Sequence, residues 1–280
     1  MKAGARVHPA LVPWVILGNF IHKIYLQHDL IRNFVVRDLR GRYIGSFMGF
    51  FWSVIHPFVL LTSYYFVFRV ILKVETPPDS GTNNFALFLF CSILPWLFFS
   101  DTLQRSSTVI IDNTNLVTKT LFPTEILPLT VLLAGLVNHL IGFAILLGII
   151  FWVLGKVSVF ILLIPVYLII LMLFTLGLAW FVSSLNVFIR DTSQVLVVIL
   201  TFWFWFTPIF YTGNKVPAKL SWIVRWNPLA HVVTGYRSCL LRMMMPDLRA
   251  LIFLALASLA VFVAGGLFFR YIKREFVDVL

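Results

Sequence analysis

Few residues in this sequence combine charge or polarity with a position inside a long apolar stretch. Asp101 and Arg105 are four residues apart, a spacing that places both on one helix face, where they can neutralise each other. The pair fits a titratable carboxylate of a proton-coupled carrier or a structural salt bridge at a helix end. Asn138 and His139 lie in a second apolar stretch, where His139 could be a proton relay or a hydrogen-bonding packing residue. We favour the structural interpretation at both places.

The other polar residues do not form a catalytic pattern. The 11 Asp and Glu residues are scattered, and the sequence contains no DxD, HExxH, GxSxG or CxxC motif. GxxxxGK followed by Ser or Thr is also absent, so the chain has no P-loop for ATP phosphates. Cys91 and Cys239 alone indicate neither a disulfide framework nor a metal site. We therefore expect no catalytic residue, metal or cofactor here, and any nucleotide energy must come from another polypeptide.

Membrane-spanning helices are the elements expected to carry these residues. Of the 280 residues, 60% are hydrophobic and 12% are charged, whereas about a quarter of a soluble domain is charged. Apolar stretches long enough to cross roughly 30 Å of hydrocarbon recur along the chain. The net charge of +11 comes from basic residues beside these stretches, where they orient the chain and contact anionic lipid, so we expect no nucleic-acid partner. We predict an all-α, polytopic membrane protein with six transmembrane helices at 46–70, 85–103, 130–154, 159–187, 193–211 and 250–269.

The N-terminal part is expected to stay on the cytoplasmic side. Residues 1–20 are interpreted as a retained cytoplasmic tail, and residues 21–45 as an amphipathic helix along the membrane interface. An amphipathic helix packed on protein would show the same pattern. Arg37, Arg40 and Arg42 flank the first span, and the positive-inside rule places them in the cytoplasm, where they fix the orientation of later spans.

Two polar segments interrupt the spans. Residues 111–129 contain two prolines and are predicted to return to the cytoplasm. Residues 212–249 are predicted to form two short helices that dip into the outer leaflet and return, as a re-entrant outer segment. Residues 270–274 carry three basic side chains, which indicate a cytoplasmic C-terminus.

Aromatic and basic residues near the predicted outer side could contact carbohydrate. Flat rings present apolar faces to sugars, but residues 202–206 cannot all face one lumen, because helix neighbours point about 100° apart. We expect most of these rings to contact lipid or other side chains. Arg225, Arg237 and Arg242 could bind phosphate or acidic sugars, with lipid headgroups as the other interpretation.

Four blocks occur in an order that is typical of one transporter family. They are RDLRGRYIGSFMGFFWSVIHP at 37–57; Asn115, Leu116, Lys119, Phe122, Pro123 and Glu125 to Pro128; Asn186, Arg190, Asp191, Thr207 to Ile209 and Tyr211; and Trp226 to Pro228, Tyr236 and Arg237. Together the blocks resemble the membrane subunit of type-2 ABC transporters, specifically the bacterial exporters of O-antigen, capsule or teichoic-acid polysaccharides.

The resemblance implies that residues 46–280 form a permease that dimerises in the bacterial cytoplasmic (inner) membrane. Two separate ATPase subunits would bind ATP and Mg, and a lipid-linked polysaccharide would pass along the interface between the two permeases. Segment 111–129 would couple the permease to the ATPase through Asn115, Leu116, Lys119, Phe122, Pro123 and Glu125. Glu125 and Lys119 are the candidate ATPase contacts, unless they are solvated loop charges.

The candidate channel and outer-segment residues are Asp101, Arg105, His139, Tyr211, Arg225, Tyr236 and Arg237. Two other functions stay open at this point. One is export of a drug or small lipid by the same architecture, and the other is a polytopic glycosyltransferase or acyltransferase.

Overall fold

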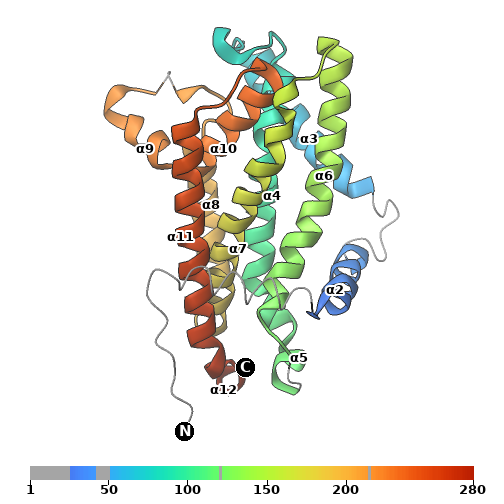
Figure 1. Cartoon of the computed structure of the whole chain (residues 1–280), viewed down its shortest axis with the longest axis vertical. Helices are drawn as coiled ribbons and strands as arrows, with labels where there is room; N and C mark the ends of the chain where they lie inside the picture. Colours follow the sequence, from blue (N-terminus) through green and yellow to red (C-terminus); the bar gives the residue numbers. More distant parts are fainter. Residues whose placement is uncertain (1–25, 42–50, 120–121, 214–215) are drawn as a thin grey trace.

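The computed structural model describes residues 26–41, 51–119, 122–213 and 216–280, and all regular structure in these ranges is helical (Figure 1). The α-helices are α2 (His28–Gly41), α3 (Trp52–Tyr65), α4 (Phe85–Asp112), α5 (Thr114–Lys119), α6 (Ile126–Leu154), α7 (Ile164–Phe188), α8 (Thr192–Phe206), α9 (Ser221–Trp226), α10 (Pro228–Arg237), α11 (Leu248–Ile272) and α12 (Phe276–Val279). Short π-helical or 3₁₀ segments extend several of them, at Phe66–Ile71, Val159–Leu163, Ala218–Leu220, Ser238–Arg242 and Lys273–Glu275. The predicted all-α class is confirmed.

Four helices of the described ranges are long and apolar enough to cross a membrane: Phe85–Asp112, Ile126–Leu154, Val159–Phe188 and Leu248–Glu275. Two shorter apolar helices, Pro57–Ile71 and Thr192–Phe206, occupy the positions of the predicted first and fifth spans. Helices α9 and α10 lie at one end of the bundle, and α5 and α12 lie at the other (Figure 1). We call these the α9 end and the α5 end.

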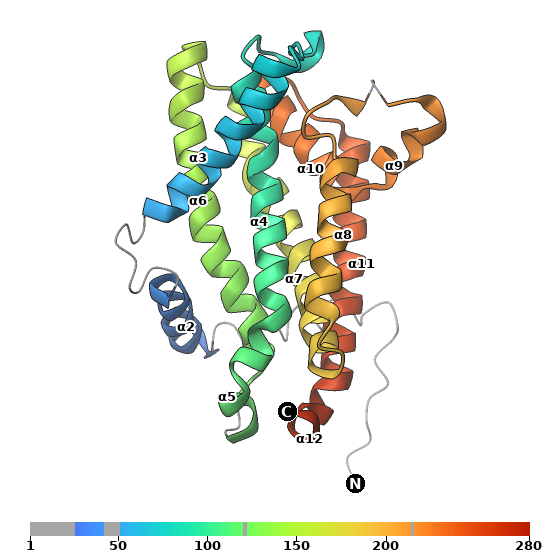
Figure 2. The ribbon, with the colours of Figure 1, turned by 180° about the vertical axis from the view of Figure 1, so that it is seen from behind.

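Helix α4 forms the centre of the bundle, between α6 and α8 when the molecule is seen from behind (Figure 2). Its apolar stretch is 83% buried, far more than that of the other three long helices. Phe88 and Phe99, both on α4, are completely buried. Their rings therefore pack against neighbouring helices and do not face lipid. The side chain of Asn84 caps the helix by accepting hydrogen bonds from the amides of Ala86 and Leu87.

Two helices end away from their predicted limits. Helix α4 continues to Asp112, beyond the predicted limit near 103, and in these last turns the hydroxyl of Ser107 finds its partner within the helix by donating to the carbonyl of Gln104. Helix α8 ends at Phe206 rather than near 211. Thr207 is extended because it precedes Pro208, which disfavours helical backbone in the residue before it.

Helices α7 and α11 come into close backbone contact where they cross. A Cβ atom on Gly265 would lie 2.0 Å from the carbonyl oxygen of Gly177, and one on Gly177 would lie 2.5 Å from the carbonyl oxygen of Val261. Only glycine fits at this crossing. Such pairs of small residues let transmembrane helices approach closely enough to gain extensive van der Waals contact.

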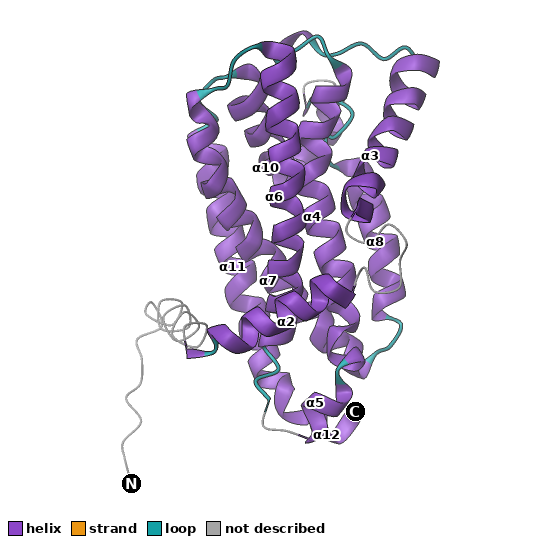
Figure 3. Cartoon of the chain, turned by 90° about the vertical axis from the view of Figure 1, so that its right-hand side faces the viewer, coloured by secondary structure: helices purple, strands orange, loops and turns teal. Residues whose placement is uncertain are grey.

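Helix α2 lies across the bundle near the α5 end, on the outside of α6 (Figure 3). Ile31 is buried, and Leu30, Phe34 and Val35 pack against the core, so one face of this amphipathic helix contacts protein. Packing on protein is compatible with a position along the membrane interface, which stays a prediction for residues 28–41. The rest of the predicted amphipathic segment, including Arg42, lies outside the described residues.

Candidate functional site

At the α5 end, the predicted coupling segment contacts α2 from the N-terminal part and Lys273 from the C-terminal part of the chain. Arg37 of α2 makes the first of these contacts. Nη2 of Arg37 donates to Oδ1 of Asn113 over 2.9 Å, just beyond the end of α4. The same guanidinium lies 4.1 Å from the centre of the Phe34 ring, and this ring contacts Phe122 at 5.2 Å between centroids. Arg37 thus attaches α2 to the coupling segment, whereas Arg40 is exposed.

An ion pair at the next residue of α2, Asp38, attaches α2 to α4. The guanidinium of Arg105 donates to the carboxylate of Asp38, and both side chains are partly buried. The ion pair that the structure shows for Arg105 is therefore with a residue 67 positions earlier, not the predicted pair with Asp101. Asp101 is exposed and lines a cavity between α3, α4 and α6.

The predicted coupling segment forms a helical elbow. It contains the end of α4, the short helix α5 and the first residues of α6. Val117 is buried and anchors α5, whereas Asn115 and Lys119 are exposed and Leu116 is partly exposed. The carbonyl of Pro123 accepts from the amide of Ile126, which starts α6.

Glu125 is held inside the protein rather than projecting from the elbow. Its Oε2 accepts from Nζ of Lys273, 3.1 Å away, and its backbone carbonyl accepts from Nε1 of Trp180, also at 3.1 Å. Only 15% of the Glu125 side chain is exposed. The elbow is therefore tied to the C-terminal end of α11 and to α7. Of the predicted coupling residues, Asn115 and Lys119 are exposed.

At the α9 end, Arg237 is the centre of a buried polar cluster. Its Nε donates to Oγ of Ser92 over 2.6 Å, and its Nη1 and Nη2 donate to the carbonyls of Tyr211 and Ile209 over 3.1 and 2.6 Å. The guanidinium also lies 3.7 Å from the centre of the Phe88 ring. With 5% of its surface exposed, Arg237 fastens the chain after α8 to α4, and it also lines a small pocket together with Asp79 and Arg242.

Asn227, directly before α10, also holds the C-terminal end of α8. Its Oδ1 accepts from Nε1 of Trp203 and from the amide of Leu229, and its Nδ2 donates to Oγ1 of Thr207 over 3.0 Å. One amide side chain thus caps α10 and holds the end of α8.

The remaining predicted site residues divide between the interior and the surface. Tyr236 is completely buried, and its hydroxyl lies 3.1 Å from Nε2 of the buried His139. This burial and this contact fit the packing and hydrogen-bonding role that we favoured for His139, which stays a prediction. The hydroxyl of Tyr211 donates to the carbonyl of Trp205 over 3.1 Å, and Arg225 is exposed on α9. Burial raises the pKa of the Tyr211 hydroxyl further above its ordinary value.

Several partners in these contacts could not be identified from local spacing. Lys273 and Glu125 are 148 residues apart, and Arg237 and Ser92 are 145 residues apart. Asp38 was part of a quoted block, but nothing near it indicated Arg105. Trp180 carried no signal at all, because an indole in an apolar helix usually packs.

Four helices long and apolar enough to cross a membrane, with short helices at both ends of the bundle, are the architecture of a multi-pass membrane protein. The chain belongs to the ABC-2 type transporter family, whose profile matches residues 30–241. This confirms the resemblance found in the four sequence blocks.

Curated relatives align over nearly the whole chain. The chain is 29% identical over 266 residues to the O-antigen export system permease protein RfbA of Myxococcus xanthus, covering 93% of this chain and 98% of the relative. It is 28% identical over 261 residues to the protein of the same name from Klebsiella pneumoniae, covering 90% and 95%. It is 25% identical over 252 residues to the polysialic acid transport protein KpsM of Escherichia coli, covering 88% and 94%.

Proposed function

We propose that this protein is the transmembrane subunit of an ATP-driven exporter that moves a lipid-linked polysaccharide across the bacterial cytoplasmic membrane. The observation that carries the proposal is the alignment over 93% of the chain with a permease named for O-antigen export. The polysialic acid transport protein supports the same substrate class, because its name also refers to a carbohydrate polymer. Neither name refers to a drug or a free lipid, so export of those compounds is the weaker alternative.

The proposed topology has six spans, with both termini in the cytoplasm. The four long apolar helices and the shorter helices that include α3 and α8 supply the spans. The α5 end then faces the cytoplasm, and α9 and α10 form the re-entrant segment on the outer side. A homodimer would enclose the path of the polymer between its two copies.

The proposed coupling site is the exposed face of α5, which carries Asn115 and Lys119. An ATPase subunit that moves this helix would also move the elements bound to the elbow. Arg37 and Asn113 connect it to α2, and Lys273 and Glu125 connect it to α11. Because these contacts are spread over several helices, a displacement of α5 can be passed to the bundle as a rigid-body movement.

The proposal is tested in a strain that lacks this gene. We expect the polymer to accumulate inside the cell, and complementation to restore it at the surface, as measured with a glycan-specific antibody on intact and permeabilised cells. Lys119→Glu should restore export less well than the wild type while reaching the membrane in equal amount. Lys156→Glu, at an exposed position beyond the other end of α6, is the matched control. Normal surface polymer in the deletion strain would contradict the proposed substrate class.

The requirement for a partner is tested separately with purified protein. The chain alone in nanodiscs should neither hydrolyse ATP nor move a labelled glycan lipid, and the complex with a co-expressed ATP-binding subunit should do both. Transport by the isolated chain would contradict the coupling mechanism.

A further inference from the structure

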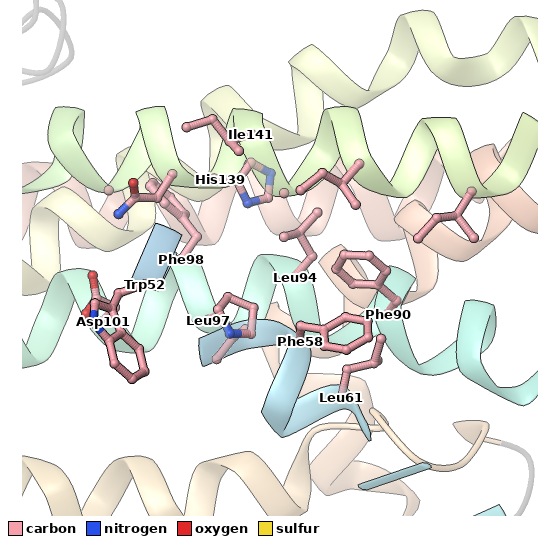
Figure 4. A pocket seen from close by; sticks show the side chains of 16 residues that line it. Trp52, Phe58, Leu61, Phe90, Leu94, Leu97, Phe98, Asp101, His139 and Ile141 are labelled. Carbon is pink, nitrogen blue, oxygen red and sulfur yellow. The ribbon is translucent and has the colours of Figure 1, made fainter. Parts of the chain in front are cut away.

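Two cavities beside α4 differ in chemistry. The cavity of about 470 Å³ between α3, α4 and α6 is lined mainly by apolar side chains, such as those of Leu94 and Phe98 (Figure 4). A pocket of about 110 Å³ at the α9 end is instead lined mainly by polar and charged residues. At about 30 Å³ for each water molecule, it has the volume of about three to four waters, which is enough for one small polar group. Its charged members are Asp79, Arg237 and Arg242, and its hydroxyl groups are those of Ser80, Thr212 and Thr234.

A close contact between two loops brings the pocket walls together. Gly81 ends the short 3₁₀ turn Pro78–Ser80, and a Cβ atom on it would lie 2.5 Å from the carbonyl oxygen of Leu241. Its φ of 77° is in the left-handed region, which also favours glycine. Asp79 belongs to this turn, and Arg242 directly follows Leu241. The contact therefore holds both charged residues at the same pocket before a ligand arrives.

The deepest charged group of the pocket is the guanidinium of Arg237, which still has donors to offer. A guanidinium carries five N–H groups, and the bonds to Ser92, Tyr211 and Ile209 use three of them. The other two N–H groups have no partner among the described residues. Because an unbonded N–H group is costly when it is buried, an acceptor in the pocket would be favoured.

The rim of the pocket adds charges and a hydroxyl group. Arg242 and Asp79 are exposed and Thr212 is partly exposed, and within the described ranges none of these three side chains has a hydrogen-bond or ion-pair partner. Together with Arg237, two guanidinium groups and one carboxylate leave one net positive charge. A singly charged oxyanion balances it, whereas Asp79 would repel a doubly charged one more strongly.

Among singly charged oxyanions, a phosphodiester fits the donors best. Its tetrahedral oxygens can accept from two guanidinium groups that approach from different sides, Arg237 from inside and Arg242 from the rim. A planar carboxylate presents its acceptors in one plane. A phosphate monoester is also less suitable, because it carries a charge of about −1.5 to −2 at neutral pH.

Exposed apolar side chains lie next to this charged rim. Met244, Met245 and Leu248 follow Arg242 in the sequence and are all exposed. A basic residue beside exposed apolar side chains is typical of the membrane interface, where the phosphates of phospholipids lie. In the proposed topology these would be lipids of the outer leaflet, but the chemistry of the pocket does not depend on that orientation.

We propose that this pocket binds one phosphodiester group, which accepts hydrogen bonds from Arg242, Arg237 and the hydroxyl of Thr212. Asp79 sets the preference for a single negative charge. The group has two sources, the headgroup of a phospholipid and a soluble phosphodiester. The site lies at the opposite end of the bundle from the proposed coupling face on α5, and it does not depend on the proposed function.

The test titrates glycerophosphoglycerol, a singly charged phosphodiester, into the full chain in detergent and phosphate-free buffer, with phosphorus NMR as the measurement. The wild type should bind it about fivefold more tightly than glycerol phosphate, a monoester. Arg242→Gln should weaken binding about fivefold, whereas Arg249→Gln, at an exposed position on α11, should not. Asp79→Asn should remove the preference for the diester, and Glu75→Gln, at an exposed position in the same loop, should keep it.

The source of the phosphodiester is identified in nanodiscs of phosphatidylglycerol. If lipid headgroups occupy the pocket, the soluble diester should no longer bind, and a photoreactive phosphatidylglycerol should label Ser238–Arg242 less in Arg242→Gln than in Arg249→Gln. Unchanged binding of the soluble diester would assign the pocket to a soluble phosphodiester. Both results support the site, because a phosphodiester occupies it in each case.

Three results in detergent would overturn the proposal. They are the absence of saturable binding by the wild type, equal binding by Arg242→Gln, and tighter binding of glycerol phosphate or acetate than of the diester. The melting temperature of Arg242→Gln without ligand should equal that of the wild type, so a loss of binding cannot be attributed to unfolding. No transport is measured, and failure here is therefore separable from failure of the proposed function.

Discussion

The ammonium group of Lys273 lies 3.1 Å from Oε2 of Glu125, although 148 residues separate them. This contact connects the last turns of the chain to the start of α6, beside the elbow that we propose as the coupling site. Because both side chains are partly shielded from water, the ion pair should be stronger than a fully exposed one.

Glu125→Lys places two ammonium groups together and should weaken the contact by about 1 kcal/mol, with a loss of export of up to about fivefold. Lys273→Glu should have the same effect, and the exchange of both charges should restore export. The measurement is surface polymer in the complemented deletion strain. Arg274→Glu, at the exposed neighbouring position, is the control. Failure of the double exchange to recover would show that the pair does not act as a unit.

The ion pair between Asp38 and Arg105 should hold α2 against the bundle. Asp38→Asn removes one charge and leaves a partly buried guanidinium without its counter-ion, so α2 should detach more often. Hydrogen exchange of the backbone amides in residues 28–41 should become faster, whereas Asp29→Asn, in the exposed first turn, should not change it. Unchanged exchange in Asp38→Asn would show that the apolar face alone holds the helix.

Loss of the Arg237 side chain should destabilise the α9 end. Arg237→Met leaves Ser92 and the carbonyls of Ile209 and Tyr211 without this donor, and we expect a loss of about 3 kcal/mol in unfolding free energy. Arg237→Lys should recover only part of it, because an ammonium cannot reproduce the planar fork. The measurement is the melting temperature in detergent. Arg242→Met, at an exposed position nearby, should melt like the wild type.

The crossing of α7 and α11 should not tolerate a side chain. Gly265→Ala places a methyl group 2.0 Å from the carbonyl oxygen of Gly177 and should cost about 1–3 kcal/mol through forced separation of the helices. Gly148→Ala, where nothing lies within 4 Å, should be neutral or slightly stabilising. Thermal unfolding of both variants provides the measurement. Equal melting temperatures would mean that the crossing relaxes without loss of stability.

The proposed topology is tested by labelling single introduced cysteines with a membrane-impermeant maleimide. Lys119→Cys should react only when the cytoplasmic side is accessible, and Lys156→Cys should react in intact spheroplasts. The native Cys91 and Cys239 are both completely buried, so they should give little background.

Replacing Arg37, Arg40 and Arg42 together with Glu should weaken the N-terminal anchor or mix the two orientations. An unchanged labelling pattern in that variant would remove their assigned role in topology.

The fold was largely predictable because its signal is local. Long apolar stretches identify spans, and Pro208 indicates where α8 stops, although the prediction extended that helix to Tyr211. The site was less predictable because its contacts are distant in sequence. The sequence indicates a surface position for Arg237, whereas in the structure Ser92 and two carbonyls surround it. Likewise, spacing predicts that Arg105 pairs with Asp101 on its own helix, whereas its partner in the structure is Asp38 on α2. A polar residue in an apolar chain shows that a partner exists but not which one.

The shortness of α8 has a consequence for the bilayer. Its 15 residues span about 22 Å, whereas an average hydrocarbon core is roughly 30 Å thick. The side chain of Asn227 donates to Oγ1 of Thr207 directly after α8. This contact fixes the chain there, so α8 cannot gain length by unwinding at this end. In the proposed topology, a locally thinner bilayer beside α8 would match its length, and a hydrophilic chain crossing there would have the shorter apolar path.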